Sequence, residues 1–334
     1  MYQPLITPKK ARSLIPISAS NTHFVDQSRK HLQSIMQPLS TQLAIGVGPC
    51  SIHQPHLAIE YAKELKAFSK TLSGNIKLYM RVFFEKPRTQ FSWKGLIHDP
   101  DLDESYALEK GILTAREILK QITDLEVPIV TELLDPHIFL FVEDFISWGM
   151  IGSRTCYSQI HRQLASHVSF PMGFKNAIDG SFSPAIHGAT YAAKAQKYIG
   201  TNIDGRLSQI TSPGNKFTHL VLRGGEKGPN FDENSINAAL ELQEKLGLRA
   251  PTVVDCSHGN ARTYKDQIEA FKSTLQQIAS TPERHIFGLM LESHLKEGRE
   301  LSLTDPCLGL DDTFALIKEA DHLLTRTTTT AAAL

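Results

Sequence analysis

The chain has 334 residues, of which 41% are hydrophobic and 21% are charged, a composition typical of soluble globular proteins. Lys plus Arg and Asp plus Glu each number 35, so the net charge is zero, which disfavours nucleic acids and membrane surfaces as partners. The apolar stretches are far shorter than a membrane span, and we expect no secretory signal. These features predict a cytoplasmic protein that binds neither nucleic acid nor membrane.

The four cysteines are far apart in the sequence and form no CxxC pair. They are Cys50, Cys156, Cys256 and Cys307. In a reducing cytoplasm we expect all of them to be free thiols.

The first 40 residues are polar and irregular, with prolines at positions 4, 8 and 16. One helix is predicted over residues 25–39. We expect residues 1–40 to form an arm or cap outside the main fold.

From residue 43 onward, short β-rich apolar runs alternate with segments of helical periodicity. Eight runs have this character: 43–52, 76–84, 128–134, 145–154, 170–176, 219–225, 251–259 and 286–293. Three intervening segments carry an apolar stripe at helical spacing. The stripes are Leu57, Tyr61, Leu65, Phe68 and Leu72; Leu108, Ile112, Ala115, Ile118, Leu119, Ile122 and Leu125; and Tyr264, Ile268, Phe271, Leu275 and Ile278.

Strands that are apolar throughout and separated by helices indicate a parallel sheet covered on both faces. Eight such units predict an α/β fold of the (β/α)8 barrel type over residues 41–324, with the N-terminal arm as a short extension. A doubly wound sheet is the alternative. The low-complexity end TRTTTTAAAL predicts a disordered tail at residues 325–334.

Positively charged residues gather where the predicted strands end, which is where barrel enzymes place their active sites. The stretch MRVFFEKPRT is the densest example, and Gly224 and Gly225 form a turn that could approach an oxyanion. The six cations would repel one another unless they bind anions, so they predict ligands with several phosphate or carboxylate groups. They are Arg81, Lys86, Arg88, Arg154, Lys175 and Arg223.

Four possible metal ligands fall at the first, seventh and eighth units. They are Cys50, His258, Glu292 and Asp305. In a closed barrel these units are neighbours, so the four side chains can meet at one open coordination site. Thiolate, imidazole and carboxylate together suit Mn, Fe, Co or Zn better than Mg. The open alternatives are a buried inert thiol, a hydrogen-bonded histidine and carboxylates that cap helices.

Other catalytic signatures are weak or missing. The chain has no GxGxxG, no GxxxxGK[ST] and no GxSxG motif, which disfavours a nucleotide-binding loop or a serine hydrolase.

Long motifs from about residue 45 to residue 317 resemble one family. They are GPCSIH, MRVFFEKPRT with WKGLIHDPDLD, SWGMIGSRTCYSQIHRQLAS, GFKNAIDG, LRGGEKGPN, DCSHGN, ESHLKEG and LTDPCLG. The chain resembles the 3-deoxy-D-arabino-heptulosonate 7-phosphate (DAHP) synthases of the large microbial type, which open the shikimate pathway. The resemblance implies a (β/α)8 barrel and a homodimeric or homotetrameric transferase. It also implies a metal-dependent condensation of phosphoenolpyruvate with erythrose 4-phosphate that releases phosphate.

The resemblance also implies roles for individual residues. Cys50, His258, Glu292 and Asp305 match the ligands of a divalent metal (Mn2+, or Fe2+, Co2+ or Zn2+). Arg81, Arg154, Lys175 and Arg223 match the residues that bind phosphoenolpyruvate, and Lys86 lies between the two substrates. Arg88 and Thr89 match the contacts to the phosphate of erythrose 4-phosphate. Lys86, Glu132 and His258 are the implied catalytic residues, with Glu132 near the attacking water.

Family members often bind an aromatic amino acid as inhibitor between a helix, a hairpin and another subunit. The matching positions here are Phe139, Leu140, Leu164, Val168, Ser169 and Tyr198. Phe139 and Leu140 stand where Pro and Gln are expected, so this effector pocket could be lost.

Three alternatives to DAHP synthesis remain at this point. The sister enzyme that uses arabinose 5-phosphate carries an Asn-Arg element in place of the KPRT motif at residues 86–89, so this motif disfavours it. A secondary-metabolism paralogue could use an amino or imino analogue of erythrose 4-phosphate. A non-catalytic sugar-phosphate-binding regulator could retain the same barrel.

Overall fold

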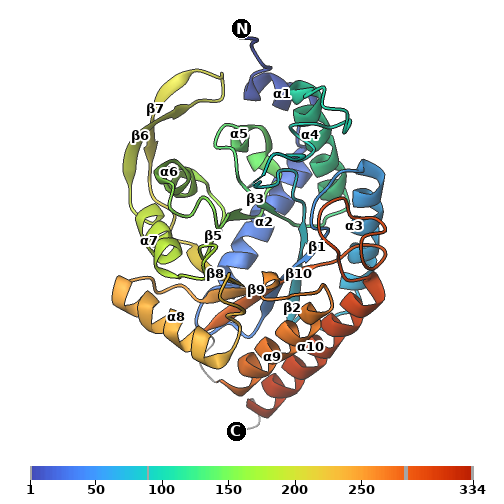
Figure 1. Ribbon diagram of the computed structural model, residues 1–334, viewed down its shortest axis with the longest axis vertical. Helices are drawn as coiled ribbons and strands as arrows, with labels where there is room; N and C mark the ends of the chain where they lie inside the picture. The colour runs from blue at the N-terminus through green and yellow to red at the C-terminus, as the bar shows by residue number, and fades with distance from the viewer. Residues whose placement is uncertain (1, 89, 282–284, 332–334) are drawn as a thin grey trace.

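The computed structural model describes residues 2–88, 90–281 and 285–331. A closed barrel of eight parallel strands lies at its centre, in the order β1-β10-β9-β8-β5-β4-β3-β2 (Figure 1). Each of the eight predicted apolar runs coincides with one of these strands to within one residue at its start or contains it, which confirms the (β/α)8 prediction. The strands are β1 (Leu43–Gly48), β2 (Ile76–Arg81), β3 (Ile129–Glu132), β4 (Trp148–Ile151), β5 (Met172–Lys175), β8 (Thr218–Gly224), β9 (Thr252–Gly259) and β10 (Ile286–Glu292).

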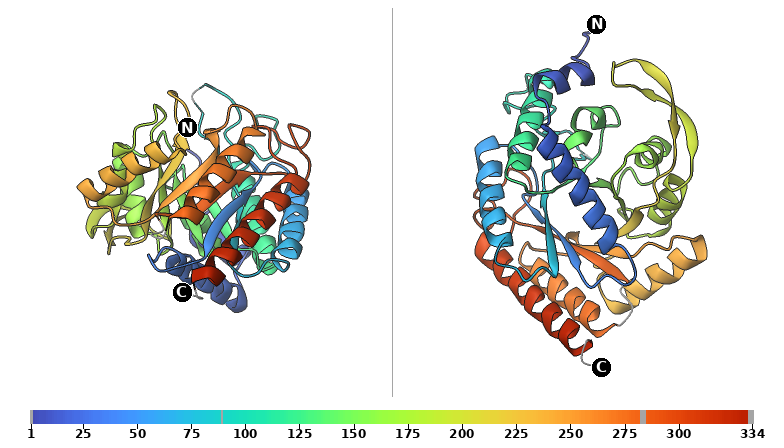
Figure 2. Two further views of the ribbon diagram at one scale, coloured as in Figure 1. Left: turned by 90° about the horizontal axis from the view of Figure 1, so that it is seen from below. Right: turned by 180° about the vertical axis from the view of Figure 1, so that it is seen from behind.

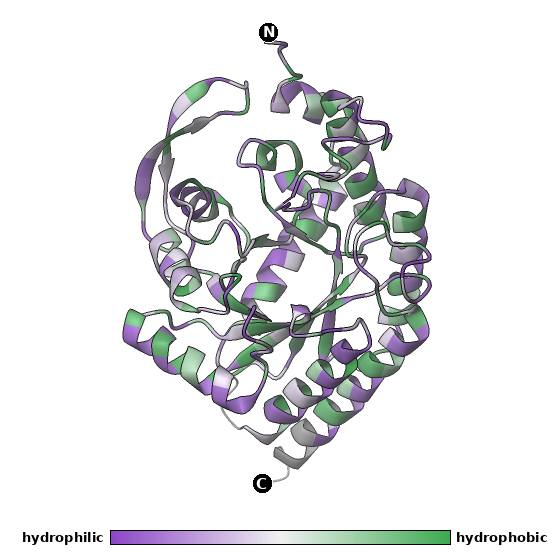
Figure 3. Cartoon of the chain, in the orientation of Figure 1, coloured by the Kyte–Doolittle hydropathy of each residue, from purple (hydrophilic) through white to green (hydrophobic). Residues whose placement is uncertain are grey.

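Helices cover the outside of the barrel, and the predicted stripes supply the faces that they bury. In α4, for example, Ile112, Ala115 and Leu119 are all buried. Figure 3 shows this as alternating hydrophobic and hydrophilic residues along the outer helices. The helices are α3 (Pro55–Ser69), α4 (Leu108–Asp124), α5 (Phe139–Val142), the 3-10 helix η1 (Glu143–Phe145), α6 (Gln159–His167), α7 (Ser183–Ala192), α8 (Glu233–Leu246), α9 (Asp266–Ser280) and α10 (Leu310–Ala331).

The N-terminal segment is more closely joined to the barrel than we expected. It forms α1 (Pro8–Leu14) and α2 (Ala19–Ile35), so the second helix begins and ends earlier than the predicted 25–39. Figure 2, right, shows α2 lying across the barrel. Leu32 and Ile35 pack in one cluster with Tyr79 and Trp148 from inside the barrel, and the Tyr79 hydroxyl donates to the carbonyl of Ser28 at 3.1 Å. The helix therefore closes the end of the barrel opposite the strand carboxyl ends.

An antiparallel hairpin between α7 and β8 was missed in the sequence. It consists of β6 (Gln196–Thr201) and β7 (Leu207–Ser212), and it forms the long yellow ribbon at one side of Figure 1. The short helix α1 contacts its turn, because the backbone nitrogen of Lys9 donates to the carbonyl of Ile203 at 2.9 Å. The side chain of Lys9 also pairs with Asp204 at 3.1 Å.

The prediction of a disordered tail from residue 325 was wrong for most of that segment, because α10 continues to Ala331. Each residue added to an existing helix gains a backbone hydrogen bond at small further cost, so a long helix extends into weak helix formers. The hydroxyl of Thr325 also donates to the carbonyl of Asp321 at 2.7 Å. Residues 332–334 lie outside the described residues. No helix within the described ranges is both long and apolar enough to cross a bilayer.

Candidate active site

A cavity of about 400 Å³ opens at the carboxyl ends of the barrel strands. Most of the predicted site residues line it, although they come from seven different strand ends or loops. These lining residues are Lys86, Arg88, Glu132, Arg154, Lys175, Arg223, His258, Glu292 and Asp305. Thr89 lies outside the described residues.

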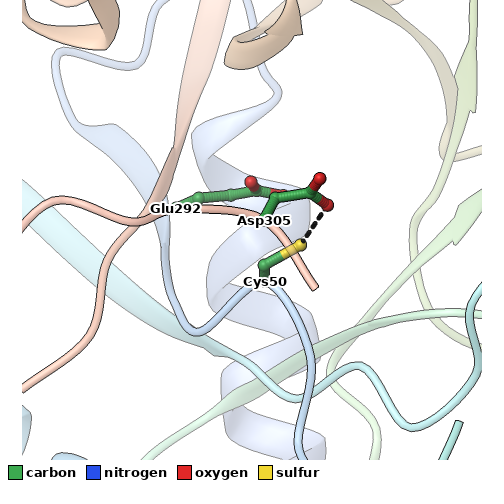
Figure 4. Close-up of side chains that lie close together, drawn as sticks. All are labelled: Cys50, Glu292 and Asp305. Carbon is green, nitrogen blue, oxygen red and sulfur yellow. Dashed lines mark hydrogen bonds between the residues drawn. The ribbon is translucent and has the colours of Figure 1, made fainter. Parts of the chain in front are cut away.

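Three of the four predicted metal ligands meet at one point (Figure 4). One ligand atom from each of Cys50, Glu292 and Asp305 lies within 4.8 Å of the others, and Sγ of Cys50 is 3.0 Å from Oδ2 of Asp305. The Nε2 atom of His258 is 3.6 Å from Oε1 of Glu292, at the edge of this group. A thiol and two carboxylates around one point, with an imidazole at the edge, fit a first-row transition metal.

His258 is oriented by its neighbours on β9. The Ser257 hydroxyl donates to Oδ1 of Asp255 at 2.6 Å and lies 2.7 Å from Nδ1 of His258. Because its single proton goes to the carboxylate, this hydroxyl accepts from Nδ1–H of His258. The same Nδ1 lies 3.1 Å from Oδ2 of Asp255, so the ring turns Nε2 toward Glu292. The backbone φ of His258 is 58°, an unusual value for a non-glycine residue that suits a functional position.

Lys86 joins the predicted metal site to the cavity. Its Nζ donates to Sγ of Cys50 at 3.0 Å and to the carbonyl of Cys50 at 3.1 Å. Burial acts to lower the pKa of Lys86, but the nearby Cys50, Glu292 and Asp305 outweigh it and the pKa is raised. Lys86 is therefore a cation at neutral pH. Burial, followed by the charge of Glu292, raises the pKa of the Cys50 thiol.

Lys175 and Glu132 form a buried ion pair at the centre of the cavity floor. The Nζ of Lys175 is 2.9 Å from Oε2 of Glu132 and 3.5 Å from Oδ2 of Asp255. Burial would raise the pKa of Glu132, but Lys175 outweighs it and the net shift is downward, so Glu132 is ionised at neutral pH. His258 and Lys175 likewise overcome burial and hold the pKa of Asp255 well below its usual range.

Arg81 lies behind the cavity wall and not on its surface. Its side chain is fully buried, and Nη2 donates to Oε1 of Glu292 at 2.8 Å. Its guanidinium stacks 4.2 Å above the ring of Phe83. The Nε and Nη1 atoms have no hydrogen-bond partner among the described residues, and buried donors of this kind normally have one. Arg81 thus holds Glu292 and retains unused donors.

The turn that carries Arg223 is built from three buried asparagines. Oδ1 of Asn176 accepts from the backbone nitrogen of Arg223 at 2.8 Å, and Oδ1 of Asn230 accepts from that of Gly224 at 2.7 Å. The backbone nitrogen of Asn230 in turn donates to Oδ1 of Asn260 at 2.8 Å. Gly224 has a φ of +71°, and a Cβ there would lie 2.1 Å from the backbone of Gly259. Only glycine fits this close approach.

Arg88 lies on a loop whose two ends are joined by a backbone hydrogen bond. The backbone nitrogen of Lys86 donates to the carbonyl of Lys94 at 2.9 Å, and Nε of Arg88 donates to the carbonyl of Trp93 at 2.8 Å. Gly95 has a φ of +115°, and a Cβ there would lie 2.0 Å from the carbonyl oxygen of Phe84. These contacts hold the loop at the cavity rim.

Several functional positions were missed in the sequence. The asparagines at 176, 230 and 260 form contacts between separate loops, so no local pattern marks them. Asp255 acts on Ser257 and His258 within the DCSHGN motif, and this short spacing is a signal that could have found it. Arg262 and Tyr264 also line the cavity. Their place directly after the DCSHGN motif is a signal that could have found them, because all loops after barrel strands face the same side.

The six positions predicted for an effector pocket lie around α5, α6 and the hairpin. The rings of Phe139 and His167 are 6.2 Å apart, and Leu164 and Val168 are buried. Burial and the charge of Glu143 raise the pKa of Tyr198 to about 12. The Ser169 hydroxyl accepts from Nη1 of Arg29 at 3.1 Å. This hydroxyl is therefore already engaged within the chain.

A family model, individual relatives and a solved structure all relate this chain to one enzyme family. Residues 16–325 match the model of the "DAHP synthetase I family". The Tyr-sensitive phospho-2-dehydro-3-deoxyheptonate aldolase of Escherichia coli K12 is 38% identical over 330 residues, covering 95% of this chain and 92% of that protein. The Corynebacterium glutamicum enzyme of the same name is 36% identical over 337 residues, covering 95% and 91%.

A solved structure, that of the phospho-2-dehydro-3-deoxyheptonate aldolase from Francisella tularensis SCHU S4, superimposes with a TM-score of 0.94 at 35% identity. The match covers 97% of this chain and 98% of that one. A family match over most of the chain, relatives of similar length and a shared barrel all agree. The chain therefore belongs to the class I DAHP synthetase family.

Proposed function

We propose that the cavity condenses phosphoenolpyruvate with erythrose 4-phosphate to give DAHP and inorganic phosphate, the first step of the shikimate pathway. This proposal rests on the finding that a group of possible metal ligands adjoins a cavity lined by cations. The group formed by Cys50, Glu292 and Asp305 lies directly against a cavity lined by Lys86, Arg88, Arg154, Lys175, Arg223 and Arg262.

Phosphoenolpyruvate, with a phosphate and a carboxylate, is assigned to the deeper cations. Arg154, Lys175 and Arg223 line the cavity, and Arg81 lies behind it with unused buried donors. Charge-assisted hydrogen bonds from arginine suit both anionic groups. Holding two mutually repelling anions in one orientation contributes to the rate by proximity.

The metal is assigned to Cys50, His258, Glu292 and Asp305. When bound, Mn2+, Fe2+, Co2+ or Zn2+ would supply Lewis-acid polarisation of the aldehyde oxygen. The Ser257 and Asp255 contacts keep the His258 ring in the orientation that this role requires.

The reaction joins the methylene carbon of phosphoenolpyruvate to the aldehyde carbon, and the aldehyde oxygen becomes an alkoxide. Lys86 is a cation in this cavity and is the proposed proton donor to that oxygen. Water adds to the carbon that bears the phosphate ester, and Glu132, which is ionised beside Lys175, is the proposed acceptor of its proton. Loss of inorganic phosphate leaves the keto group of DAHP, which balances the reaction.

We also propose that the protein is a homodimer or homotetramer. The hairpin presents Ile199 and Leu207 to solvent at 77% and 79% exposure, and such aliphatic residues on a β-edge suit contact with a second copy. Light scattering of the full chain gives the mass directly, and a monomer would contradict this assignment.

The test of the reaction is phosphate release from phosphoenolpyruvate with each aldehyde in turn. Erythrose 4-phosphate should give turnover that depends on added metal, and arabinose 5-phosphate should give little. Preferred turnover of an amino analogue of erythrose 4-phosphate would assign the chain to secondary metabolism. Metal-independent turnover, or none with any aldehyde, would overturn the proposed function.

A further inference from the structure

The cavity contains one cation that the proposed reaction leaves without a role. Arg262 follows β9 on the loop that leads to α9, and its side chain lines the cavity together with Thr263 and Tyr264. It has no carboxylate within ion-pair distance among the residues that the structure describes. Lys86 and Lys175, in contrast, already contact Cys50 and Glu132.

The backbone of Arg262 is held in place although its side chain is exposed. The carboxylate of Asp266 accepts from the backbone nitrogens of Arg262 and Thr263 at 3.0 and 2.8 Å, and from the Thr263 hydroxyl at 3.0 Å. Asn260, at the base of the loop, donates to the carbonyl of Asp255 at 2.8 Å. A backbone fixed at both ends of the loop keeps the base of this side chain at the rim, so the backbone loses little entropy when a ligand binds.

The order of the strands places the loops of Arg88 and Arg262 on either side of the strands that lead to Cys50 and Glu292. Around the barrel the sequence is β2, β1, β10, β9, so Arg88 and Arg262 belong to loops that flank the strands of Cys50 and Glu292. An aldehyde directed at the Cys50, Glu292 and Asp305 group would extend its other end toward the rim between these two arginines.

The phosphate at the far end of the aldehyde carries more negative charge than one cation can neutralise. A phosphate monoester carries about −1.5 to −2 charges at neutral pH. Arg88 has one side-chain nitrogen committed to the carbonyl of Trp93, which leaves its terminal nitrogens for a ligand. One arginine therefore neutralises the phosphate only in part.

We propose that Arg262 is a second cation for the phosphate group of the aldehyde substrate, acting together with Arg88 from the far side of Cys50 and Glu292. This inference rests on the proposed function for the identity of the aldehyde. It makes Arg262 a determinant of affinity for a phosphorylated aldehyde and assigns it no part in proton transfer.

The experiment compares Arg262→Ala and Arg262→Lys with the unchanged enzyme in the metal-loaded full chain. Arg262→Ala should raise KM for erythrose 4-phosphate roughly 10- to 100-fold, the usual loss for one charge-assisted hydrogen bond, with kcat and KM for phosphoenolpyruvate changed less than about 2-fold. Arg262→Lys should recover part of this loss because a positive charge remains. The salt dependence of KM for erythrose 4-phosphate should also become shallower in the alanine variant.

Lys265→Ala is the matched control. Lys265 is a cation on the same loop, but it pairs with Glu297 at 3.5 Å and does not line the cavity, so its removal should leave both KM values within about 2-fold. If Arg262→Ala changes both KM values equally, or changes neither, the inference is wrong. Wild-type turnover with erythrose 4-phosphate would still support the proposed function in that case. Absence of wild-type turnover with erythrose 4-phosphate would instead overturn the proposed function itself.

Discussion

The ammonium nitrogen of Lys86 lies 3.0 Å from the sulfur of Cys50, and that sulfur lies 3.0 Å from Oδ2 of Asp305. A thiol thus stands between an ammonium group and a carboxylate, which links the expected metal ligands to the expected proton donor. A thiol must lose its proton to bind a metal, so metal binding depends on the protonation state of Cys50 and in turn changes it.

The first prediction is that Cys50 and His258 are required for metal binding. Cys50→Ala or His258→Ala should abolish both bound transition metal and turnover, since each removes one donor from a four-residue site. Elemental analysis measures the metal, and circular dichroism should show the barrel still folded. Chelation of the wild-type enzyme should stop turnover reversibly.

Cys156→Ala is the control for this prediction. Cys156 is also a buried thiol, but its sulfur donates to the carbonyl of Ser153 at 3.2 Å, away from the predicted metal ligands. This variant should keep its metal and activity. Full activity of metal-free wild-type enzyme would contradict the prediction.

The second prediction concerns oxidation of two cysteines. Cys307 is two residues beyond Asp305, and the backbone of Cys50 is among the groups that act on the pKa of Cys307, which burial raises to about 12. A bound metal would hold Cys50 as the thiolate, which is the reactive form. We therefore expect air with a redox-active metal to join Cys50 to Cys307, with oxygen accepting the two electrons of the thiol pair.

Mass mapping of inactivated enzyme should then show these two residues in one disulfide. Cys307→Ser should resist inactivation, and Cys256→Ser should not. Two free thiols in the inactivated protein would exclude the disulfide.

The third prediction separates the two phosphate sites. Arg88→Ala should raise KM for erythrose 4-phosphate much more than KM for phosphoenolpyruvate, because Arg88 stands on the rim loop. Arg154→Ala should have the reverse effect. Each KM should rise about tenfold or more, and steady-state kinetics with one substrate varied at a time measures it. Parallel changes in both constants would show that the two sites are wrongly assigned.

The barrel was predictable from the sequence because its strands are buried on both faces. A run such as residues 43–48 is apolar at every position, and this continuous pattern differs from the stripes of the surrounding helices. Most of the site residues were predictable for a related reason, because a barrel brings the carboxyl ends of all its strands to one face. Lys175 and Glu132 are far apart in sequence, yet their side chains are 2.9 Å apart.

The side-chain environment of the site could not be predicted in the same way. Whether Arg81 lines the cavity or supports Glu292 depends on packing against Phe83. The role of Asp255 depends on the turn at Ser257 and His258, where the φ of His258 is positive. In the hairpin, β6 and β7 alternate between half-buried and exposed positions, and Ser212 is the one buried residue of these two strands. Strands with so little buried apolar surface resemble a polar loop in the sequence.

The fourth prediction concerns stability in acid. Burial lowers the pKa of His219 to about 3, and its Nε2 accepts from Nε1 of Trp148 at 3.1 Å. The folded protein keeps this imidazole neutral, whereas the unfolded chain protonates it below about pH 6.5. Stability should therefore fall as the pH drops through about 6.5 toward 3, by about 2 kcal/mol between roughly pH 7.5 and pH 5 from this group alone.

His219→Gln is the variant that tests this. Glutamine can accept from Trp148 but cannot titrate, so the urea midpoint of the variant should change less than that of the wild type between about pH 7.5 and pH 5. An identical pH dependence in the two proteins would show that His219 does not contribute to it.

The last prediction is that phenylalanine and tyrosine inhibit this enzyme weakly or not at all. Phe139 and Leu140 are only 7% and 6% exposed, and they stand where a proline and a hydrogen-bonding glutamine are expected. The Ser169 hydroxyl, which would otherwise be available to an amino-acid ligand, already accepts from Arg29 at 3.1 Å. Each hydrogen bond that a buried, charged ligand cannot make costs roughly 1–3 kcal/mol, which is about tenfold or more in affinity. Titration of each aromatic amino acid into the phosphate-release assay measures this directly, and half-inhibition at micromolar phenylalanine or tyrosine would contradict it.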